Sequence, residues 1–199
     1  MEPFISLKSK AVPLAQDNID TDQIIPARFL ARPRDDDHGI NFFRDLRFDA
    51  AGNEIAEFPL NHSAWRDARI ILGGRNFACG SSRENAVWAL HGWGARAVIA
   101  PSFGDIFAIN AVKNGVLPII LPAEAVSALI AASMAAPEAE IAIDLPAQTV
   151  TAPDGTVHRF DIDPFAKRSL LEGLDELAFT MTHEEDIAAF ERRFGRDNF

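Results

Sequence analysis

The stretch GGRNFACGSSRENAVWAL, residues 73–90, joins a strand-like run to a helix-like run, and the rest of the chain is organised around it. It follows the apolar run 69–72. Its second half and the residues that follow it carry apolar side chains at the spacing of one buried helix face: Ala86, Ala89, Leu90 and Trp93. Unpaired N–H groups and the dipole at a helix start favour an anion. The turn therefore predicts a carboxylate or phosphate site, to which Arg83 adds a planar guanidinium.

An alternation of short strands and amphipathic helices continues from this stretch. The predicted elements are strand 69–72, helix 82–93, strand 97–100, helix 103–113, strand 117–121 and helix 123–135. Ser102 and Asp105 predict a capping pair for the second helix. The third helix is expected to bury one face, made by Val126, Leu129, Ile130 and Met134. This alternation predicts an α/β fold with a largely parallel central sheet flanked by helices.

The two ends of the chain add further elements, which we expect to belong to one domain over residues 1–199. Residues 4–14 predict one or two strands. Three short strands are predicted at 141–145, 148–151 and 156–160, the last two forming a hairpin. Asp163 and Pro164 predict the start of a helix that runs to about Gly173. A capping box over 182–185 predicts a final helix with three inward side chains: Ile187, Phe190 and Phe194.

The long segment 31–68 is irregular and charged. A loop of this length in a compact domain is usually functional or disordered. Aromatic residues along it favour an anchored, functional flap: Phe42, Phe43, Phe48, Phe58 and Trp65.

Composition excludes several classes of protein. The net charge of −10 argues against nucleic acid, whose phosphates are bound by clustered Lys and Arg. We expect no membrane span, because no apolar run approaches the ~20 residues required. The first residues do not resemble a signal peptide, so a cytoplasmic location is expected. Cys79 is the single cysteine and the five histidines are scattered, so the chain alone is not expected to hold a metal or an iron–sulfur cluster.

Each polar residue of the turn has two interpretations. Ser81 and Glu84 match a capping box, in which Ser81 only caps its helix. Alternatively, if Ser82 is the cap, Ser81 is free to act on a bound acid near N–H donors. Arg83 could pair with a surface carboxylate or bind a ligand. Cys79 could be an activated nucleophile or a small buried side chain.

The segment 20–22 allows two interpretations as well. Asp20 and Asp22 could form a plain Asx turn, or their carboxylates could orient a base or a substrate hydroxyl.

Three motifs in this order resemble the small subunit of bacterial 3-isopropylmalate dehydratase: NIDTDQIIPARFL at 18–30, NFACGSSRE at 76–84 and AVIAPSFGDIF at 97–107. The resemblance covers nearly the whole chain, including 114–118 and 173–176. That subunit is similar to the swivelling domain of aconitase. The resemblance therefore implies a single swivelling domain with the β/β/α fold of aconitase domain 4, a small β-hairpin and C-terminal helices.

The resemblance also implies a function. It indicates a heteromeric hydro-lyase of leucine biosynthesis, a heterodimer or heterotetramer that interconverts 2-isopropylmalate and 3-isopropylmalate through 2-isopropylmaleate. The large subunit would hold a [4Fe–4S] cluster whose iron acts as a Lewis acid, and this chain would bind no cofactor. Ser81 would remove the proton next to a carboxylate, with Asp22 as a supporting residue. The expected contacts to the dicarboxylate substrate are Thr21, Arg28, Ser82 and Arg83.

Two departures from the family leave the substrate open. Asn85 stands where the family usually has histidine, and Arg34-Asp-Asp-Asp-His-Gly39 replaces a Thr-Gly-Phe-Gly-like tip that selects the substrate side chain. The first alternative is a related hydro-lyase of the citramalate/citraconate, dimethylmalate or homoaconitate type. Others are a non-catalytic anion-binding module and a thiol enzyme based on Cys79.

Overall fold

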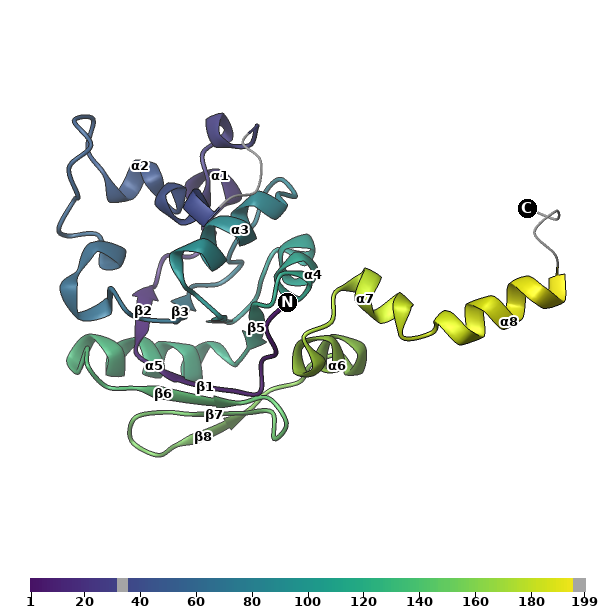
Figure 1. Ribbon diagram of the computed structural model, residues 1–199. Helices are drawn as coiled ribbons and strands as arrows, with labels where there is room; N and C mark the ends of the chain where they lie inside the picture. The colour runs from purple at the N-terminus through teal and green to yellow at the C-terminus, as the bar shows by residue number, and fades with distance from the viewer. Residues whose placement is uncertain (32–35, 195–199) are drawn as a thin grey trace.

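Two four-stranded sheets form the body of the chain in the computed structural model, which describes residues 1–31 and 36–194 (Figure 1). The parallel sheet has the order β2 (Ala11–Leu14), β3 (Ile70–Gly73), β4 (Ala97–Ala100), β5 (Leu117–Ile120). The antiparallel sheet has the order β1 (Ser6–Ser9), β6 (Ile141–Asp144), β7 (Thr149–Thr151), β8 (Val157–Arg159). The predicted α/β fold with a parallel central sheet is confirmed. The predicted hairpin β7–β8 is one half of the antiparallel sheet, and the other half is the pair β1–β6.

The first two strands belong to different sheets, although only Lys10 separates them. β1 runs antiparallel to β6, whereas β2 runs parallel to β3. At the crossing point the Ser9 hydroxyl donates to the carbonyl of Lys10 (2.9 Å) and accepts from the N–H of Arg69 (2.9 Å). The buried Ser9 side chain therefore bonds backbone groups where the chain leaves one sheet for the other.

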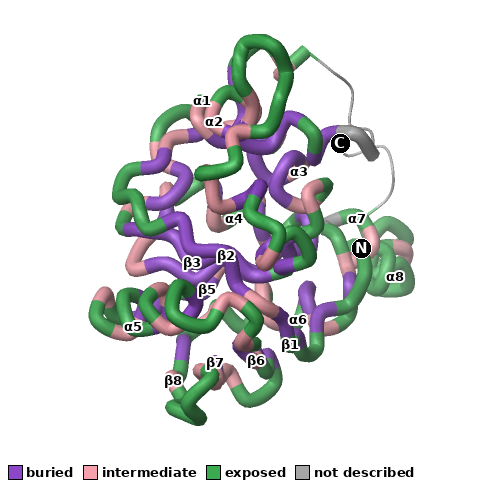
Figure 2. The backbone as a smooth tube through the Cα atoms, turned by 90° about the vertical axis from the view of Figure 1, so that its left-hand side faces the viewer, coloured by how far each residue is buried: buried purple, intermediate pink, exposed green. Residues whose placement is uncertain are grey.

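Helices cover one face of the parallel sheet and the second sheet lies beyond the other. α3 (Glu84–Trp93) and α4 (Asp105–Lys113) pack with Val12, Ile71 and Val98 in one buried cluster. On the opposite face, Ile70, Leu72 and Ile99 form a second cluster with α5 (Ala123–Ala135) and the antiparallel sheet. Figure 2 shows the parallel strands as a buried centre between these layers. No helix within the described ranges has the length and apolar character to cross a bilayer.

The buried face of α5 differs from the prediction at one position. Val126 and Leu129 are buried as expected, but Met134 is 63% exposed. Ser133 takes the inward position instead, and its hydroxyl donates to the carbonyl of Ala11 (2.5 Å). This hydrogen bond to β2 satisfies a polar side chain in the core.

The segment between β2 and β3 consists of short helical turns: α1 (Thr21–Ile24), α2 (Arg44–Arg47), and 3₁₀ turns at Ala27–Phe29, Asp36–Asn41, Pro59–Asn61 and Ser63–Trp65. Phe42, Phe43 and Trp65 are buried against the face that α3 covers. The buried guanidinium of Arg47 donates to the carbonyl of Phe42 (3.2 Å) and the side-chain oxygen of Asn61 (3.1 Å). Burial lowers the pKa of Arg47. The two hydrogen-bond acceptors favour the charged form of the guanidinium and so oppose this effect.

The C-terminal part leaves the body of the protein. α6 (Pro164–Glu172) has the predicted start, because the Asp163 carboxylate accepts from the N–H of Phe165 (2.9 Å). The predicted capping box at 182–185 is wrong, because the Thr182 hydroxyl donates to the carbonyl of Phe179 (2.6 Å) at the end of α7 (Glu176–Met181). In α8 (Glu184–Phe194), no described residue is buried.

The predicted inward face of α8 is therefore also wrong. Ile187, Phe190 and Phe194 are 42%, 50% and 45% exposed. Figure 1 shows the physical reason, since α8 projects away from both sheets and the described body does not cover this face.

The contact between Gly39 and α3 gives a prediction about stability. A Cβ atom at Gly39 would lie 2.3 Å from the carbonyl carbon of Gly92, so either backbone would have to move. We expect Gly39→Ala to lower the free energy of unfolding by about 1–3 kcal/mol, measured by denaturant titration. Ser127→Ala on the exposed side of α5 is the control and should change it by less than about 0.5 kcal/mol. An unchanged unfolding midpoint for Gly39→Ala would contradict this packing.

Candidate active site

The candidate site lies at the carboxyl end of the parallel strands, where the segments after β2, β3 and β4 meet. The N–H of Thr21 donates to the carbonyl of Cys79 (2.9 Å), which ties the first segment to the second. The N–H of Phe77 donates to the carbonyl of Ser102 (3.0 Å), and that of Gly104 donates to the carbonyl of Phe77 (2.9 Å). These bonds hold the three segments together at the edge of the sheet where ligands of open α/β folds bind.

The turn after β3 has an uncommon backbone. Asn76, Ala78 and Gly80 have φ angles of 57°, 58° and 92°, in the left-handed region that disfavours side chains such as that of Ala78. Neighbouring contacts hold it in place. A Cβ atom at Gly104 would lie 2.4 Å from the carbonyl oxygen of Ala78, so only glycine allows this approach. The Ser102 hydroxyl oxygen also accepts from the N–H of Asn76 (2.8 Å). Strained residues held by their surroundings in this way cluster at functional sites.

The capping interpretation of the two serines is wrong. α3 begins at Glu84, two residues later than predicted, and Arg83 occupies the N-cap position without a side-chain bond. Glu84 does not close a capping box, since its carboxylate accepts from the side-chain amide of Asn114 (3.0 Å). Among the described residues, no side-chain hydrogen bond engages the hydroxyl of Ser81 or Ser82, and both residues are exposed.

Both serines line a hollow of about 180 Å³ between the starts of α3 and α4, which we call the Ser81 pocket. Its remaining lining residues are Thr21, Ala78, Gly80, Arg83, Gly104, Asp105, Ile106 and Phe107. The predicted cap of α4 by Ser102 and Asp105 is wrong, because Gly104 is the N-cap residue and has no side-chain cap bond. The first turns of both helices thus lack side-chain caps, and Arg83 and Asp105 at these starts line the hollow. Uncapped helix starts of this kind are typical of anion sites.

Arg83 is the positive side chain of this hollow. Its guanidinium forms a two-point ion pair with Asp22, in which the Nη2–Oδ2 distance is 3.0 Å. The Arg83 side chain is 14% exposed and that of Asp22 is 57% exposed, so the pair lies at the rim of the pocket. Two of the five guanidinium N–H groups point at Asp22, which leaves further donors for a ligand.

α1 places Asp22 and Thr21 beside the turn. The Asp20 carboxylate caps α1 by accepting from the N–H of Gln23 (2.8 Å), and the Gln23 side chain accepts from the N–H of Asp20 (3.0 Å). Asp20 is thus the local cap, while Asp22 reaches across to Arg83. The buried Thr21 hydroxyl donates to the carbonyl of Ser81 (2.9 Å) and fixes the backbone at that serine.

Arg28 lies apart from these residues. Its guanidinium pairs with Asp45 (Nη1–Oδ2 2.8 Å) and stacks over the ring of Phe29, 4.6 Å from the centroid. The Asp45 carboxylate raises the pKa of Arg28, and Arg28 in turn lowers the pKa of Asp45. The structure therefore places Arg28 beside a second surface hollow, lined also by Arg44 and Phe48, and not in the Ser81 pocket.

Cys79 is held in the turn by its backbone N–H, and its thiol makes only a longer contact. Its N–H donates to the carbonyl of Ile19 (3.1 Å), and the half-buried Sγ lies 3.6 Å from the same oxygen. Among the described pocket residues there is no histidine to serve as a base. The described ranges also contain no group of three or more His, Cys, Asp or Glu residues that could hold a metal ion.

The structure describes the two departures noted in the sequence to different extents. Asn85 is half-buried in the first turn of α3. Of the acidic stretch 34–39, residues 34 and 35 and the side chains of 36 and 37 lie outside the described part of the chain. His38 is buried, and its ring lies edge-on to Trp88 at 5.5 Å.

Comparisons with known proteins agree on one family. The aconitase C-terminal domain model matches residues 1–124, and the LeuD_N model matches residues 127–164. The chain is 49% identical to the 3-isopropylmalate dehydratase small subunit of Roseobacter denitrificans, over 96% of each chain. It is 48% identical to the protein of the same name from Parvibaculum lavamentivorans, over 97% of this chain and 96% of that one. The crystal structure of 3-isopropylmalate dehydratase from Methanocaldococcus jannaschii superposes with a TM-score of 0.67 at 25% identity, covering 93% of this chain and 99% of that chain.

The hydrogen bond from Thr21 to Ser81 gives a second prediction. Thr21→Val keeps the shape of the side chain but leaves the carbonyl of Ser81 without its partner. We expect the free energy of unfolding to fall by about 1–2 kcal/mol, measured by denaturant titration. Thr21→Ser keeps the hydroxyl and is expected to retain most of this stability. Equal stability of the valine and serine variants would show that the bond has no net effect.

Proposed function

Since the chain belongs to the family of 3-isopropylmalate dehydratase small subunits, we propose that it is the small subunit of a heteromeric hydro-lyase of leucine biosynthesis. The proposed reaction removes water from 2-isopropylmalate and adds it back to 2-isopropylmaleate to give 3-isopropylmalate. The observation that carries this proposal is the pair of unbonded hydroxyls, Ser81 and Ser82, beside Arg83 and two uncapped helix starts. We propose that residues 1–199 act as one swivelling domain. The expected cytoplasmic location stays a prediction.

The proposed partner is a large subunit that carries a [4Fe–4S] cluster, as a heterodimer or heterotetramer. When bound, that cluster supplies a Lewis acid for the departing hydroxyl group. Among the described residues, no three His, Cys, Asp or Glu side chains are grouped as metal ligands would be, and both serines that line the hollow of about 180 Å³ are exposed. A partner that covers the hollow would complete the site and exclude water from it.

Within this chain, Ser81 is the proposed base. Its hydroxyl makes no side-chain hydrogen bond within the described part of the chain, and its backbone is fixed by Thr21, so the oxygen can be directed at a substrate proton next to a carboxylate. A neutral serine hydroxyl is too weak a base, so Ser81 would act as the alkoxide, which takes up the substrate proton and becomes the hydroxyl. Removal of the proton places negative charge on the substrate. Arg83 and the open N–H groups of α3 and α4 would stabilise that charge better than water does.

The remaining residues have proposed roles in binding. Ser82 and Arg83 would bind the substrate carboxylate through a hydroxyl and a planar guanidinium. Asp22 would hold the guanidinium in place through the two-point ion pair, which makes it a positioning residue. Thr21 would act through the backbone of Ser81. Arg28 would reach the substrate only if its ion pair with Asp45 opened. We therefore propose no contact between Arg28 and the substrate when the substrate first binds.

Serine variants separate this proposal from the alternatives. We expect Ser81→Ala to lower kcat about 10²–10⁴-fold with little change in KM, measured in the complex with the large subunit. Ser127→Ala is the matched control on an exposed helix surface and should retain full activity. Cys79→Ser should also retain activity. An inactive Cys79→Ser variant together with an active Ser81→Ala variant would favour the thiol enzyme instead.

Reconstitution tests the partner and the substrate together. We expect the isolated chain to be colourless and inactive, and to gain dehydratase activity when mixed with a cluster-bearing large subunit. Assays with 2-isopropylmalate, citramalate, dimethylmalate and homocitrate compare the alternative substrates by kcat/KM. A preference for another alkylmalate would support the related hydro-lyase. Robust activity of the isolated chain would contradict the proposal, and substrate binding without turnover in every combination would indicate an anion-binding module.

A further inference from the structure

An apolar groove lies beside the candidate active site. It has a volume of about 430 Å³ and is formed by α4, β5, α6 and the beginning of α7. We call it the α4 groove, and its main apolar lining residues are Phe103, Ile109, Val112, Ile120 and Phe165. Ile109, Ile120 and Phe165 are 56%, 57% and 49% exposed, which is unusual for large apolar side chains that gather in one place.

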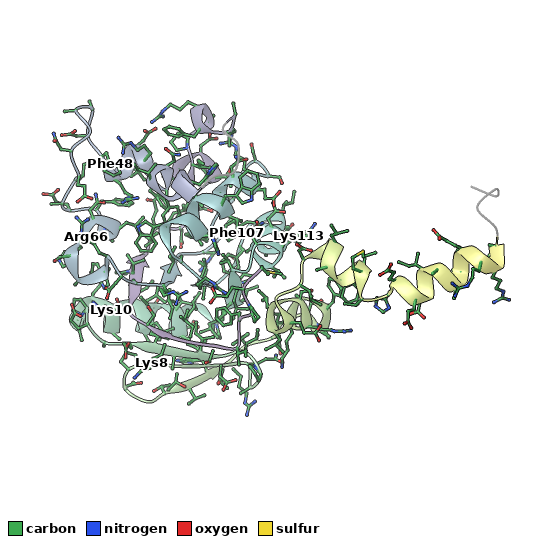
Figure 3. All side chains as sticks on the ribbon, in the orientation of Figure 1. Lys8, Lys10, Phe48, Arg66, Phe107 and Lys113 are labelled. Atoms are coloured by element: carbon green, nitrogen blue, oxygen red, sulfur yellow. The ribbon has the colours of Figure 1, made fainter. Side chains whose placement is uncertain are left out.

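The groove is continuous with the candidate site through α4. The first turn of this helix, with Asp105, Ile106 and Phe107, lines the Ser81 pocket, and the next turns line the groove. Ile106, on the pocket side, is 49% exposed. Figure 3 labels Phe107 in the first turn and Lys113 in the last, beside the chain segment that leads to α7. A protein that covers the pocket therefore meets the groove next.

The same side of the molecule carries the uncovered C-terminal helices. Leu177 and Met181 of α7 are 71% and 55% exposed, and the exposed phenylalanines of α8 follow them. Elsewhere, exposed large apolar residues such as Ile5 and Met134 do not line the α4 groove or the Ser81 pocket. Most of the exposed large apolar side chains among the described residues thus belong to α4, β5, α6 and the helices that follow α6. Figure 1 shows α7 and α8 leading away from α6.

The charge around the groove limits what can occupy it. Asp161, Asp163 and Asp175 line it and are exposed, so the three carboxylates outnumber the basic side chain of Lys113 in the same lining. A second copy of this chain carries a net charge of −10 and would bring like charges towards these carboxylates. A partner with basic side chains around an apolar segment matches it better.

We propose that the α4 groove docks an apolar segment of the large subunit, with basic side chains of that segment facing Asp161, Asp163 and Asp175. This inference rests on the proposed function, because the large subunit must cover the Ser81 pocket to complete the active site. Docking in the groove would place the partner over the start of α4. The groove would thus hold the two halves of the site together without touching the substrate.

The test compares two exposed helix residues. Ile109→Asp places a charge in the groove, and Met134→Asp makes the same kind of change on α5, away from the groove. Affinity for the purified, cluster-loaded large subunit is measured anaerobically by biolayer interferometry without substrate. We expect Ile109→Asp to weaken binding at least tenfold and Met134→Asp to leave it within twofold of wild type. At saturating large subunit, Ile109→Asp should regain near wild-type kcat, since its Ser81 pocket is intact.

Two results would overturn the inference. The first is a wild-type affinity of Ile109→Asp for the large subunit in a complex that is catalytically active. The second is an Ile109→Asp variant that loses self-association in analytical ultracentrifugation but keeps its affinity for the large subunit, which would assign the groove to a second copy. Ile109→Ser is the milder variant if the aspartate variant unfolds, as judged by circular dichroism. By contrast, an inactive wild-type complex would count against the proposed function and not against the groove alone.

Discussion

The parallel pairing of β2, β3 and β4 is the constraint on which the candidate site depends. It brings three segments that are distant in sequence to one edge of the sheet, where backbone bonds join Thr21 to Cys79 and Phe77 to Ser102. Those bonds permit the left-handed conformations of Asn76 and Ala78, which local preferences alone would not support. The turn therefore has its shape because neighbouring segments fix it, and two hydroxyls remain free at its end.

At this edge of the sheet, α3 and α4 begin without side-chain caps, which leaves the helix starts available to a ligand. Neither α3 nor α4 has a side-chain cap at its start, although each cap would contribute about 1 kcal/mol to stability. By contrast, α1 and α6 are capped by Asp20 and Asp163. Arg83 supplies positive charge where the N–H groups are open, and Asp22 keeps its guanidinium at the rim. The arrangement favours a bound carboxylate in place of an internal cap.

The C-terminal helices show the limit of reasoning from helical patterns. The apolar spacing of Ile187, Phe190 and Phe194 indicates an amphipathic helix, and α8 is such a helix. The pattern cannot say whether the chain itself covers that face. Here the described body leaves it exposed, as it does Ile109 and Ile120 in the α4 groove. The sequence of one subunit of a larger enzyme does not show which other subunit covers its exposed apolar surface.

By itself, the sequence determined the order of strands and helices, the parallel sheet and the family, because periodicity and motif spacing are local properties. The family resemblance also predicted a shared site for Ser81, Ser82, Arg83 and Thr21, which line one hollow in the structure, while their roles stay a prediction. The tertiary structure alone decided that Ser81, Ser82 and Ser102 do not cap helices, and which polar side chains pair with one another. Ser102 bonds Asn76, Glu84 bonds Asn114, and Asp22 pairs with Arg83, while Arg28 is drawn away by Asp45. A short polar side chain takes whichever partner the fold brings within about 3 Å, and these partners come from other parts of the chain.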